Sequence, residues 1–497
     1  MIRFTEENGA LIARSRNETI RIEGWGNNAL RVRTTLLKKL PRDAHALTEN
    51  VAHSAKVTID EGSETAEIVN GKIKATVNGV GIICFYKDNE LILQEYYSYY
   101  YGSVRKEAIC YKIRSREYKG LASDDFKITV RFESDPKEKL FGMGQYQMPI
   151  LDLKGSVLPL EQRNSQVSVP FVVSNKGYGM LWNNPSTGEA AFGTNITKWI
   201  SDESDMVDYW ITADDTPAQI VTNYTECVGR APVMSKDYLG LWQCKLRYRT
   251  PDEVLEVARK YKEMGIRLDV IVIDFFHWPH QGDWRFDEKY WSRDAVKAMT
   301  DELHAMGTKV MVSVWPSVDK RSENYYEMEQ KALISTTDVG SVQTYDYEGD
   351  CGTVDFFNPE AQEFVWSKCK QNYRDWGIDL FWLDNSEPDS TKYDFENYRY
   401  YTGRGSKVGC EYPKKYVEAF YNGQEAEGDH EAVNLCRSAW VGSQKYRTLV
   451  WTGDVQSNFE SFKDQVIAGQ NMGLAGIPWW TTDIGGFMTD NWDDPDF

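Results

Sequence analysis

A unit that recurs along the second half of the chain constrains the fold most: a short apolar run of strand type, followed by a segment with helical spacing. Residues 268–274 (LDVIVID) form one such run, nearly continuous in apolar side chains, as expected for a parallel strand buried on both faces. Just before it, Thr250-Pro-Asp-Glu253 carries the side chains of a capped helix start, and Gly265 can end that helix. The pattern predicts parallel strands joined by helices.

Seven units of this kind can be counted. Beyond the run at 268–274, one lies near 241–247, and the others end at Trp315, Asp384, Ser438, Asp454 and Asp483. Seven alternations favour a (β/α)₈ barrel of the TIM type over an open doubly wound sheet, which would need fewer units and a glycine-rich phosphate loop. Because an eighth unit does not follow before Phe497, we expect the natural protein to be longer.

The first half of the chain has strand character. Apolar and polar residues alternate with period two over 19–23, 29–34 and 127–132, and turn signals such as Asn70-Gly71 separate such runs. No helix is expected before about residue 215. The sequence therefore predicts an α/β plus all-β chain, with an N-terminal antiparallel β-sandwich over 1–235 and a barrel over 236–497 that lacks its last unit.

Charge and composition exclude some functions. With 57 Lys+Arg against 75 Asp+Glu, the net charge of −18 argues against a nucleic-acid partner, which needs a basic surface. The absence of an eighteen-residue apolar run argues against a membrane span. The start lacks the order of a secretion signal, and the eight cysteines form no C-x-x-C pair, so we expect free thiols and a cytoplasmic protein. A homo-oligomer stays open.

Aspartates stand at four of the strand ends. They are Asp274, Asp384, Asp454 and Asp483. Any one of them could merely cap the following helix. In a barrel, however, the carboxyl ends of all strands meet at one rim, where four carboxylates repel one another unless function uses them. Together they predict an active site.

The residues around these aspartates favour sugar chemistry over metal or serine chemistry. The six histidines are scattered, with His277 and His280 favoured as surface or loop residues, and a G-x-S-x-G elbow is absent. Aromatic residues make up 13% of the chain, and four tryptophans lie within four residues of a rim aspartate: Trp382, Trp451, Trp479 and Trp480. Paired carboxylates with aromatic walls are the combination that glycoside hydrolysis needs.

The motifs themselves resemble a known family. Trp382-Leu-Asp-Asn-Ser-Glu387 resembles the nucleophile signature of glycoside hydrolase family 31, and Trp451-Thr-Gly-Asp454 resembles its acid/base segment. Arg437-Ser438 and Asp483-Ile-Gly-Gly-Phe487 match the family's order, as do Asp274 and the sandwich segment 177–183. Five ordered motifs are specific together, although each alone would be weak.

The resemblance implies a retaining α-glycosidase that uses neither a cofactor nor a metal. Carried over by position, Asp384 is the nucleophile and Asp454 the general acid/base. The resemblance further assigns a set of substrate-binding residues: Asp274, Phe275, Trp315, Trp382, Arg437, Trp451, Asp483 and Phe487.

The expected substrate is an oligosaccharide or glycoside with a terminal α-linked sugar. The bulky Phe275 after Asp274 leaves little room for a hydroxymethyl group, which favours α-xylosides. An α-glucosidase, another family 31 α-glycosidase or transglycosylase, and a carbohydrate-binding homologue that no longer hydrolyses are the alternatives.

Overall fold

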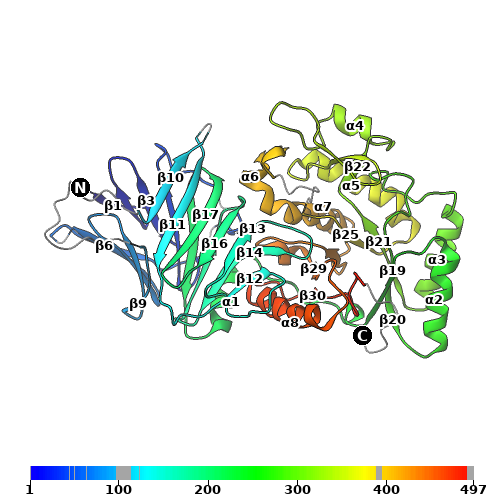
Figure 1. The fold of residues 1–497 in the computed structure, drawn as a ribbon, viewed down its shortest axis with the longest axis horizontal. Helices are drawn as coiled ribbons and strands as arrows, with labels where there is room; N and C mark the ends of the chain where they lie inside the picture. The colour runs from blue at the N-terminus through cyan, green and yellow to red at the C-terminus, as the bar shows by residue number, and fades with distance from the viewer. Residues whose placement is uncertain are drawn as a thin grey trace. The chain divides into compact units, whose positions relative to one another are not determined.

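A computed structural model describes residues 2–43, 45–49, 51–62, 64–96, 114–121, 124–387 and 395–489. The chain forms two compact units, drawn in Figure 1. The first comprises Met1–Glu161, Ser168–Arg230 and Asn458–Pro478; the second comprises Gln162–Val167, Ala231–Ser457 and Trp479–Phe497. The sequence did not indicate that residues 162–167 belong to the second unit, or that residues 458–478 belong to the first.

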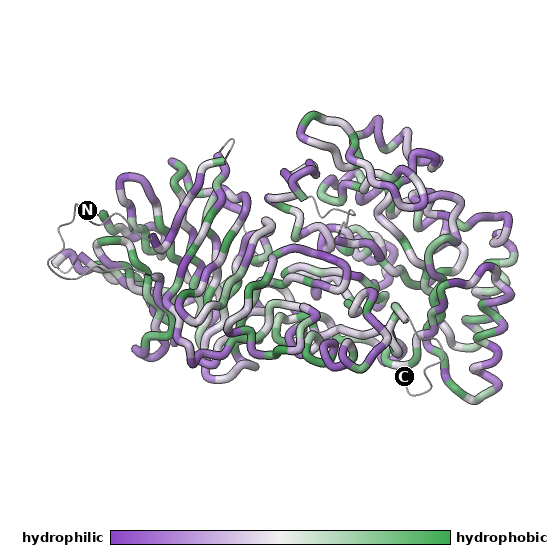
Figure 2. The backbone as a smooth tube through the Cα atoms, in the orientation of Figure 1, coloured by the Kyte–Doolittle hydropathy of each residue, from purple (hydrophilic) through white to green (hydrophobic). Residues whose placement is uncertain are grey.

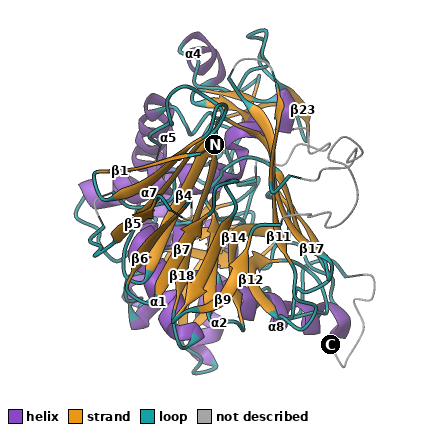
Figure 3. Cartoon of the chain, turned by 90° about the vertical axis from the view of Figure 1, so that its left-hand side faces the viewer, coloured by secondary structure: helices purple, strands orange, loops and turns teal. Residues whose placement is uncertain are grey.

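The first unit confirms the predicted antiparallel sandwich and is built mostly of strands (Figure 3). Its eight-stranded sheet has the order β1 (Arg3–Glu7), β2 (Ala10–Arg14), β3 (Thr19–Gly24), β4 (Ala29–Thr35), β18 (Val207–Ala213), β15 (Tyr178–Trp182), β14 (Val167–Ser174) and β12 (Leu140–Gln145). One five-stranded sheet has the order β10 (Arg116–Gly120), β11 (Phe126–Glu133), β17 (Ile196–Ser204), β16 (Gly188–Phe192) and β13 (Val157–Leu160). The other is a meander of β5 (Lys56–Asp60), β6 (Thr65–Asn70), β7 (Ile73–Val77), β8 (Ile83–Lys87) and β9 (Glu90–Gln94).

Hydropathy explains the layers of this unit. Buried and partly exposed residues alternate strictly along β3 and β6, so each strand turns one side chain in two toward the core. Figure 2 shows hydrophilic and hydrophobic positions alternating among these strands. By contrast β4, β18, β15 and β14, which follow one another in the eight-stranded sheet, are buried along their whole length.

The described residues of the first unit include two helices. Helix α1 (Pro217–Val228) begins at Thr216, whose hydroxyl accepts from the backbone N–H of Gln219. Helix α8 (Phe459–Leu474) packs against β12, where Asn471 Oδ1 accepts from the backbone N–H of Gly142 at 2.8 Å.

The second unit carries the parallel barrel sheet that the repeated units predicted. Its order is β19 (Leu241–Lys245), β20 (Leu268–Ile273), β21 (Lys309–Val314), β25 (Leu380–Leu383), β28 (Asn434–Cys436), β29 (Thr448–Trp451) and β30 (Trp480–Thr481). The α-helices of this unit are α2 (Pro251–Glu263), α3 (Arg293–Ala305), α4 (Tyr325–Gln330), α5 (Pro359–Asn372), α6 (Gly405–Val408) and α7 (Tyr412–Ala426). Short antiparallel strands lie outside the barrel: β22 (Ser317–Asp319), β23 (Thr344–Asp346), β24 (Asp350–Thr353), β26 (Arg399–Tyr400) and β27 (Gly403–Arg404). The short 3₁₀ helices are η2 (Lys236–Tyr238), η3 (Arg374–Trp376), η4 (Phe395–Asn397), η5 (Gly409–Glu411) and η6 (Ser443–Tyr446).

The inner strands of the parallel sheet, β20, β21, β25, β28 and β29, are buried on both faces, whereas β19 and β30 at its ends are partly exposed. Along β20, Val270 and Val272 pack in an inner cluster with Met311 and Leu449, whereas Ile271 and Ile273 pack in the outer core. The outer core also contains apolar residues of helices α2 and α3, which flank this part of the sheet (Figure 1). The even positions of β20 therefore point to the barrel interior.

Among the residues that the structure describes, no helix is both long and apolar enough to cross a membrane.

Candidate active site

The rim aspartates follow their strands directly or within a short loop. Asp274 comes after β20 and has the parity of the inward-facing Val270 and Val272, so its side chain begins on the inner side of the barrel. Asp384 comes after β25, and its backbone N–H donates to the carbonyl of Val314 on the neighbouring β21. Both side chains are almost fully buried, with 3% and 6% of their residue surface exposed.

Arg437, which follows β28, connects the two predicted catalytic carboxylates. Its Nη1 lies 3.3 Å from Asp384 Oδ1 and 3.9 Å from Asp454 Oδ2. Its Nε donates to both carboxylate oxygens of Glu387, at 2.9 and 3.0 Å, and its Nη2 donates to Asn385 Oδ1 at 2.9 Å. One guanidinium thus fixes two residues of the Asp384 loop and stands between the two catalytic candidates.

Backbone strain supports the geometry at Asp384. The next residue, Asn385, has a φ of 51°, a left-handed conformation that asparagine tolerates better than most residues. In this conformation its N–H donates to Asp384 Oδ1 at 2.7 Å, and its Nδ2 donates to the hydroxyl of Tyr345 at 3.2 Å. The turn therefore orients the carboxylate through its own backbone.

Asp454 is held by a segment remote in sequence. Asn164 Nδ2 donates to Asp454 Oδ2 at 2.6 Å, while Asn164 Oδ1 accepts from the Asp454 backbone N–H at 3.1 Å. Gly453 makes this approach feasible, because a Cβ there would lie 2.7 Å from both Asn164 Oδ1 and the Ser165 nitrogen. The Asp454 side chain is 25% exposed, against 8% for Asp384.

The carboxylates of the rim influence one another. Burial, reinforced by the charges of Asp384, Asp454 and Asp483, raises the pKa of Asp274 to about 8. Burial raises the pKa of Asp384 to about 6, with Asp454 adding to the effect and Arg437 opposing it. Burial and the same two neighbours raise the pKa of the half-buried Asp483 to about 7. The four aspartates that the sequence singled out therefore do converge on one site.

A group of aromatic rings adjoins Asp274. The N–H of Phe275 donates to Asp274 Oδ1, and its ring lies 5.1 Å from that of Trp315. Trp315 stacks in turn on Tyr347, with ring centroids 5.6 Å apart. Phe276 has a φ of 61°, which is unusual for a bulky residue and typical of functional sites. These rings form an aromatic wall next to the carboxylates.

Trp382 and Trp451 lie deeper, and Phe487 lies further out. The rings of Trp382 and Trp451 meet edge to face at 5.3 Å and adjoin the inner barrel cluster. The buried indole N–H groups of Trp278, Trp315 and Trp382 find no acceptor among the described residues. Phe487 is 37% exposed, and its backbone N–H donates to the Val455 carbonyl.

The structure adds residues that sequence reasoning had not placed in the site. Glu387 was visible within the motif at Asp384, but its role as the buried partner of Arg437 was not. Asn164, Tyr345 and Tyr347 gave no signal, because each comes from a segment outside the counted strands.

His277 lies in a loop, one of the two positions that the sequence favoured, but it is not at the surface. His277 is buried, Nδ1 lies 2.9 Å from the Asp274 carbonyl, and Nε2 lies 2.8 Å from the Tyr373 hydroxyl. Burial lowers its pKa to about 4, so the ring is neutral and holds the loop after β20 in place. Within the described parts of the chain, no group of three or more His, Cys, Asp or Glu residues is arranged to hold a metal ion.

Comparison with known proteins identifies the family of this chain. Residues 231–496 match the TIM-barrel domain of glycosyl hydrolases family 31, and residues 19–190 match the family's N-terminal galactose mutarotase-like domain. The chain belongs to glycoside hydrolase family 31. It is therefore a glycoside hydrolase, as the motifs predicted.

Several family 31 members are similar over most of the chain. An uncharacterized family 31 glucosidase, ORF2 of Pseudescherichia vulneris, is 47% identical over all of this chain and 95% of its own length. An α-xylosidase of Saccharolobus solfataricus is 34% identical over a segment that covers 74% of this chain and 50% of the relative. The crystal structure of a family 31 α-xylosidase from a soil metagenome, complexed with xylose, matches with a TM-score of 0.93 at 46% identity, covering 98% of this chain and 72% of that one.

Proposed function

We propose that the protein is a retaining α-glycosidase that acts on terminal α-xylosides through a covalent glycosyl–Asp384 intermediate. The assignment of roles rests on one observation: Asp384 and Asp454 both lie near Arg437 Nη1, but they differ in exposure to solvent. The Asp384 side chain is almost fully buried and is held in place by Asn385 and Arg437, which suits a nucleophile that must be aligned with the anomeric carbon. Asp454 is more open to water, with which an acid/base residue exchanges its proton.

In the first step, an oxygen of Asp384 attacks the anomeric carbon and the bond to the leaving oxygen breaks. Asp454 transfers its proton to that oxygen, so the aglycone departs as a neutral alcohol and a β-linked glycosyl ester remains. In the second step, Asp454 removes a proton from water, whose oxygen attacks the anomeric carbon and releases Asp384. The sugar leaves in the α configuration of the substrate.

The aromatic wall supports the choice of sugar. Phe275 is tied to Asp274 by a hydrogen bond and its ring lies against Trp315, which restricts the space for a substituent on sugar C5. Family 31 relatives named as α-xylosidases support the same choice. A steric exclusion of one hydroxymethyl group is worth about 1–3 kcal/mol, so the α-glucoside should be a slower substrate and not an inert one.

Two measurements test the proposal. Proton NMR during hydrolysis of an aryl α-xyloside should detect α-xylose first, before mutarotation produces the β anomer. Initial release of β-xylose would contradict the retaining mechanism. The kcat/KM for aryl α-xyloside should exceed that for the matched α-glucoside by about tenfold or more; an equal or larger value for the glucoside would overturn the sugar assignment.

A further inference from the structure

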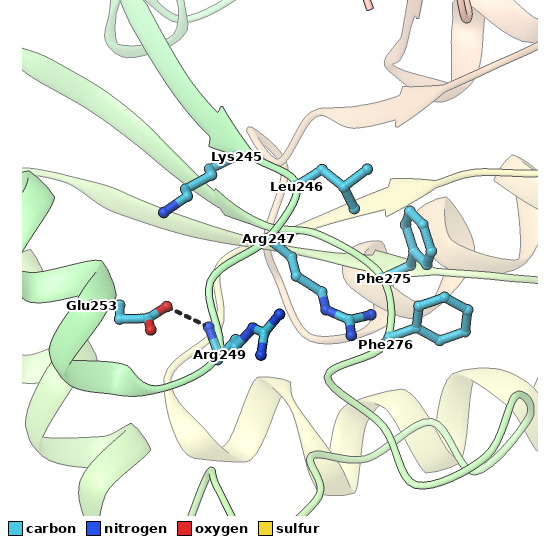
Figure 4. A pocket seen from close by; sticks show the side chains of 7 residues that line it. All are labelled: Lys245, Leu246, Arg247, Arg249, Glu253, Phe275 and Phe276. Atoms are coloured by element: carbon cyan, nitrogen blue, oxygen red, sulfur yellow. Dashed lines mark hydrogen bonds between the residues drawn. The ribbon is translucent and has the colours of Figure 1, made fainter.

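The barrel unit contains a pocket that the catalytic roles above leave unused. It has a volume of about 460 Å³ and lies where β19 ends and helix α2 begins (Figure 4). Seven residues line it: Lys245, Leu246, Arg247, Arg249, Glu253, Phe275 and Phe276.

Three of the lining residues are cations that have no counter-charge within the described part of the chain. In a chain with a net charge of −18, Lys245, Arg247 and Arg249 form no ion pair with any described residue. Glu253 also lines the pocket, but its Oε2 accepts from the backbone N–H of Arg249 at 2.7 Å and leaves that guanidinium unpaired. The pocket therefore presents donors that no carboxylate among the described residues satisfies.

Two of the cations face the aromatic side. In Figure 4 the guanidinium groups of Arg247 and Arg249 turn toward the space beside Phe276, while Lys245 extends away from the phenylalanines. The Arg247 guanidinium carbon lies 5.1 Å from the centroid of the Phe276 ring, within the range of a cation–π contact, which favours keeping the guanidinium beside this ring.

Phe275 belongs to both the pocket and the catalytic site. Its N–H donates to Asp274 Oδ1 and its ring packs against Trp315. The next residue, Phe276, contacts the Arg247 guanidinium through its ring. A sugar held at Asp274 would therefore direct its aglycone toward a space flanked by two phenyl rings and two guanidinium groups.

We propose that this pocket binds a carboxylate carried by the glycoside, so that acidic glycosides are preferred over neutral ones. This inference rests on the proposed α-glycosidase function and specifies its substrate class. Planar guanidinium groups match the two oxygens of a carboxylate, and the phenyl rings accept the apolar body that carries it. The negative charge of the rim carboxylates would repel a substrate that carries a carboxylate. The positive charges of Arg247 and Arg249 offset this repulsion.

The test uses two matched pairs of substrates. In the first pair, 4-(2-carboxyethyl)phenyl α-xyloside is compared with its carboxamide, which has the same leaving group without the charge. In the second pair, an aryl α-glucuronide is compared with the α-glucoside, which places the charge on the sugar instead. We expect the carboxylate member of one pair to have a kcat/KM about five- to tenfold higher than its neutral partner at low salt, and the pair that responds identifies where the substrate carries its charge.

Variants attribute the preference to the pocket. Arg247→Gln combined with Arg249→Gln should bring the ratio within each pair to about one or below. Lys260→Gln, which removes a charge from the exposed face of α2, should keep the wild-type ratio. The same ratios should appear in the Kd values from calorimetry, which do not depend on turnover.

The outcomes separate this inference from the proposed function. Hydrolysis of the neutral glycosides without any preference for charge, in rate or in Kd, would overturn the carboxylate pocket alone. Failure to hydrolyse any of the four substrates would overturn the proposed function, and the Kd ratios would still decide the pocket. A preference that persists in the double variant would also overturn the assignment to these two arginines.

Discussion

The sandwich and the barrel each bury charged side chains, but they do so in opposite ways. In the sandwich, Arg31 on β4 donates through Nε and Nη2 to both oxygens of Asp208 on β18, at 3.0 and 2.6 Å, with both side chains almost wholly buried. Asn183 completes the set by donating to Asp208 Oδ2 at 2.8 Å. In the barrel, Asp384, Asp454 and Glu387 share Arg437, and Asp274 and Asp483 add their carboxylates to those of Asp384 and Asp454, so carboxylates outnumber the cation in this group of residues.

The difference separates a structural role from a chemical one. A buried pair whose hydrogen bonds are complete is a fixed element of the fold, and breaking it leaves a charge without a partner. At the barrel rim, burial and the charges of the neighbouring aspartates raise the pKa values of Asp274, Asp384 and Asp483 into the range where protons move at physiological pH, although Arg437 opposes the shift at Asp384. Variants of the two regions should therefore lose different properties.

The largest effect is expected from the nucleophile. Asp384→Ala removes the group that forms the glycosyl ester, and kcat should fall by about 10⁴-fold or more while the protein remains folded. Added azide can attack in its place and should yield the β-glycosyl azide, whereas Asp454→Ala with azide should yield the α-glycosyl azide. Product analysis by NMR distinguishes the two roles, and the opposite anomers would reverse them.

The paired charges of the sandwich should respond through stability. Arg31→Met leaves Asp208 buried and charged without its main partner, and the free energy of unfolding should fall by about 3–5 kcal/mol. Urea denaturation measures the loss, and kcat/KM well below the transition should stay near the wild-type value. The double variant Arg31→Met/Asp208→Leu, which removes both charges, should recover much of the stability; no recovery would show that the pair is not what Arg31 contributes.

Removing a charge from the barrel rim should stabilise the protein, in contrast to removing Arg31 from the sandwich. The folded state holds the Asp274 proton more tightly than the unfolded chain does, so this stability is present at low pH and is lost as pH rises toward about 8. Asp274→Asn cannot ionise and should be more stable than the wild type, by almost nothing near pH 4 and by about 1–3 kcal/mol at pH 8. Thermal unfolding across this range tests the sign. A variant less stable at pH 8 would show that the Asp274 charge is compensated in the native protein.

Position along the strands explains what the sequence could predict. Asp274 and Asp384 follow buried apolar runs, and the parallel topology alone brings such positions to one rim. The sandwich followed from period-two alternation along strands such as β3. These features depend on local patterns, which a single sequence displays.

Contacts between distant segments explain what it could not predict. Asn164 precedes Asp454 by 290 residues, and nothing in the segment 162–167 marks it as part of the barrel unit. The burial of His277 depends on Tyr373, and the packing of α8 in the first unit depends on β12. Glu387 is the intermediate case, since its motif was visible while its ion pair with Arg437 was not.

The smallest effect is expected at Glu387, and it tests how far the barrel charges are coupled. Burial is the main cause of the raised pKa of Asp384, and the negative charges of Asp454 and Glu387 add to it while Arg437 opposes it. Glu387→Gln removes one of these charges and leaves the Arg437 charge less neutralised, and both changes favour ionised Asp384. Because the nucleophile must be ionised, the acid limb of the kcat/KM profile, near pH 6 in the wild type, should move to lower pH by a few tenths of a unit to one unit.

Glu363→Gln on the exposed face of α5 removes the same charge at a distance and should leave the limb in place. An acid limb that stays unchanged or moves upward in the Glu387 variant would mean that another group controls it, and that the excess negative charge of the barrel does not set the ionisation of Asp384.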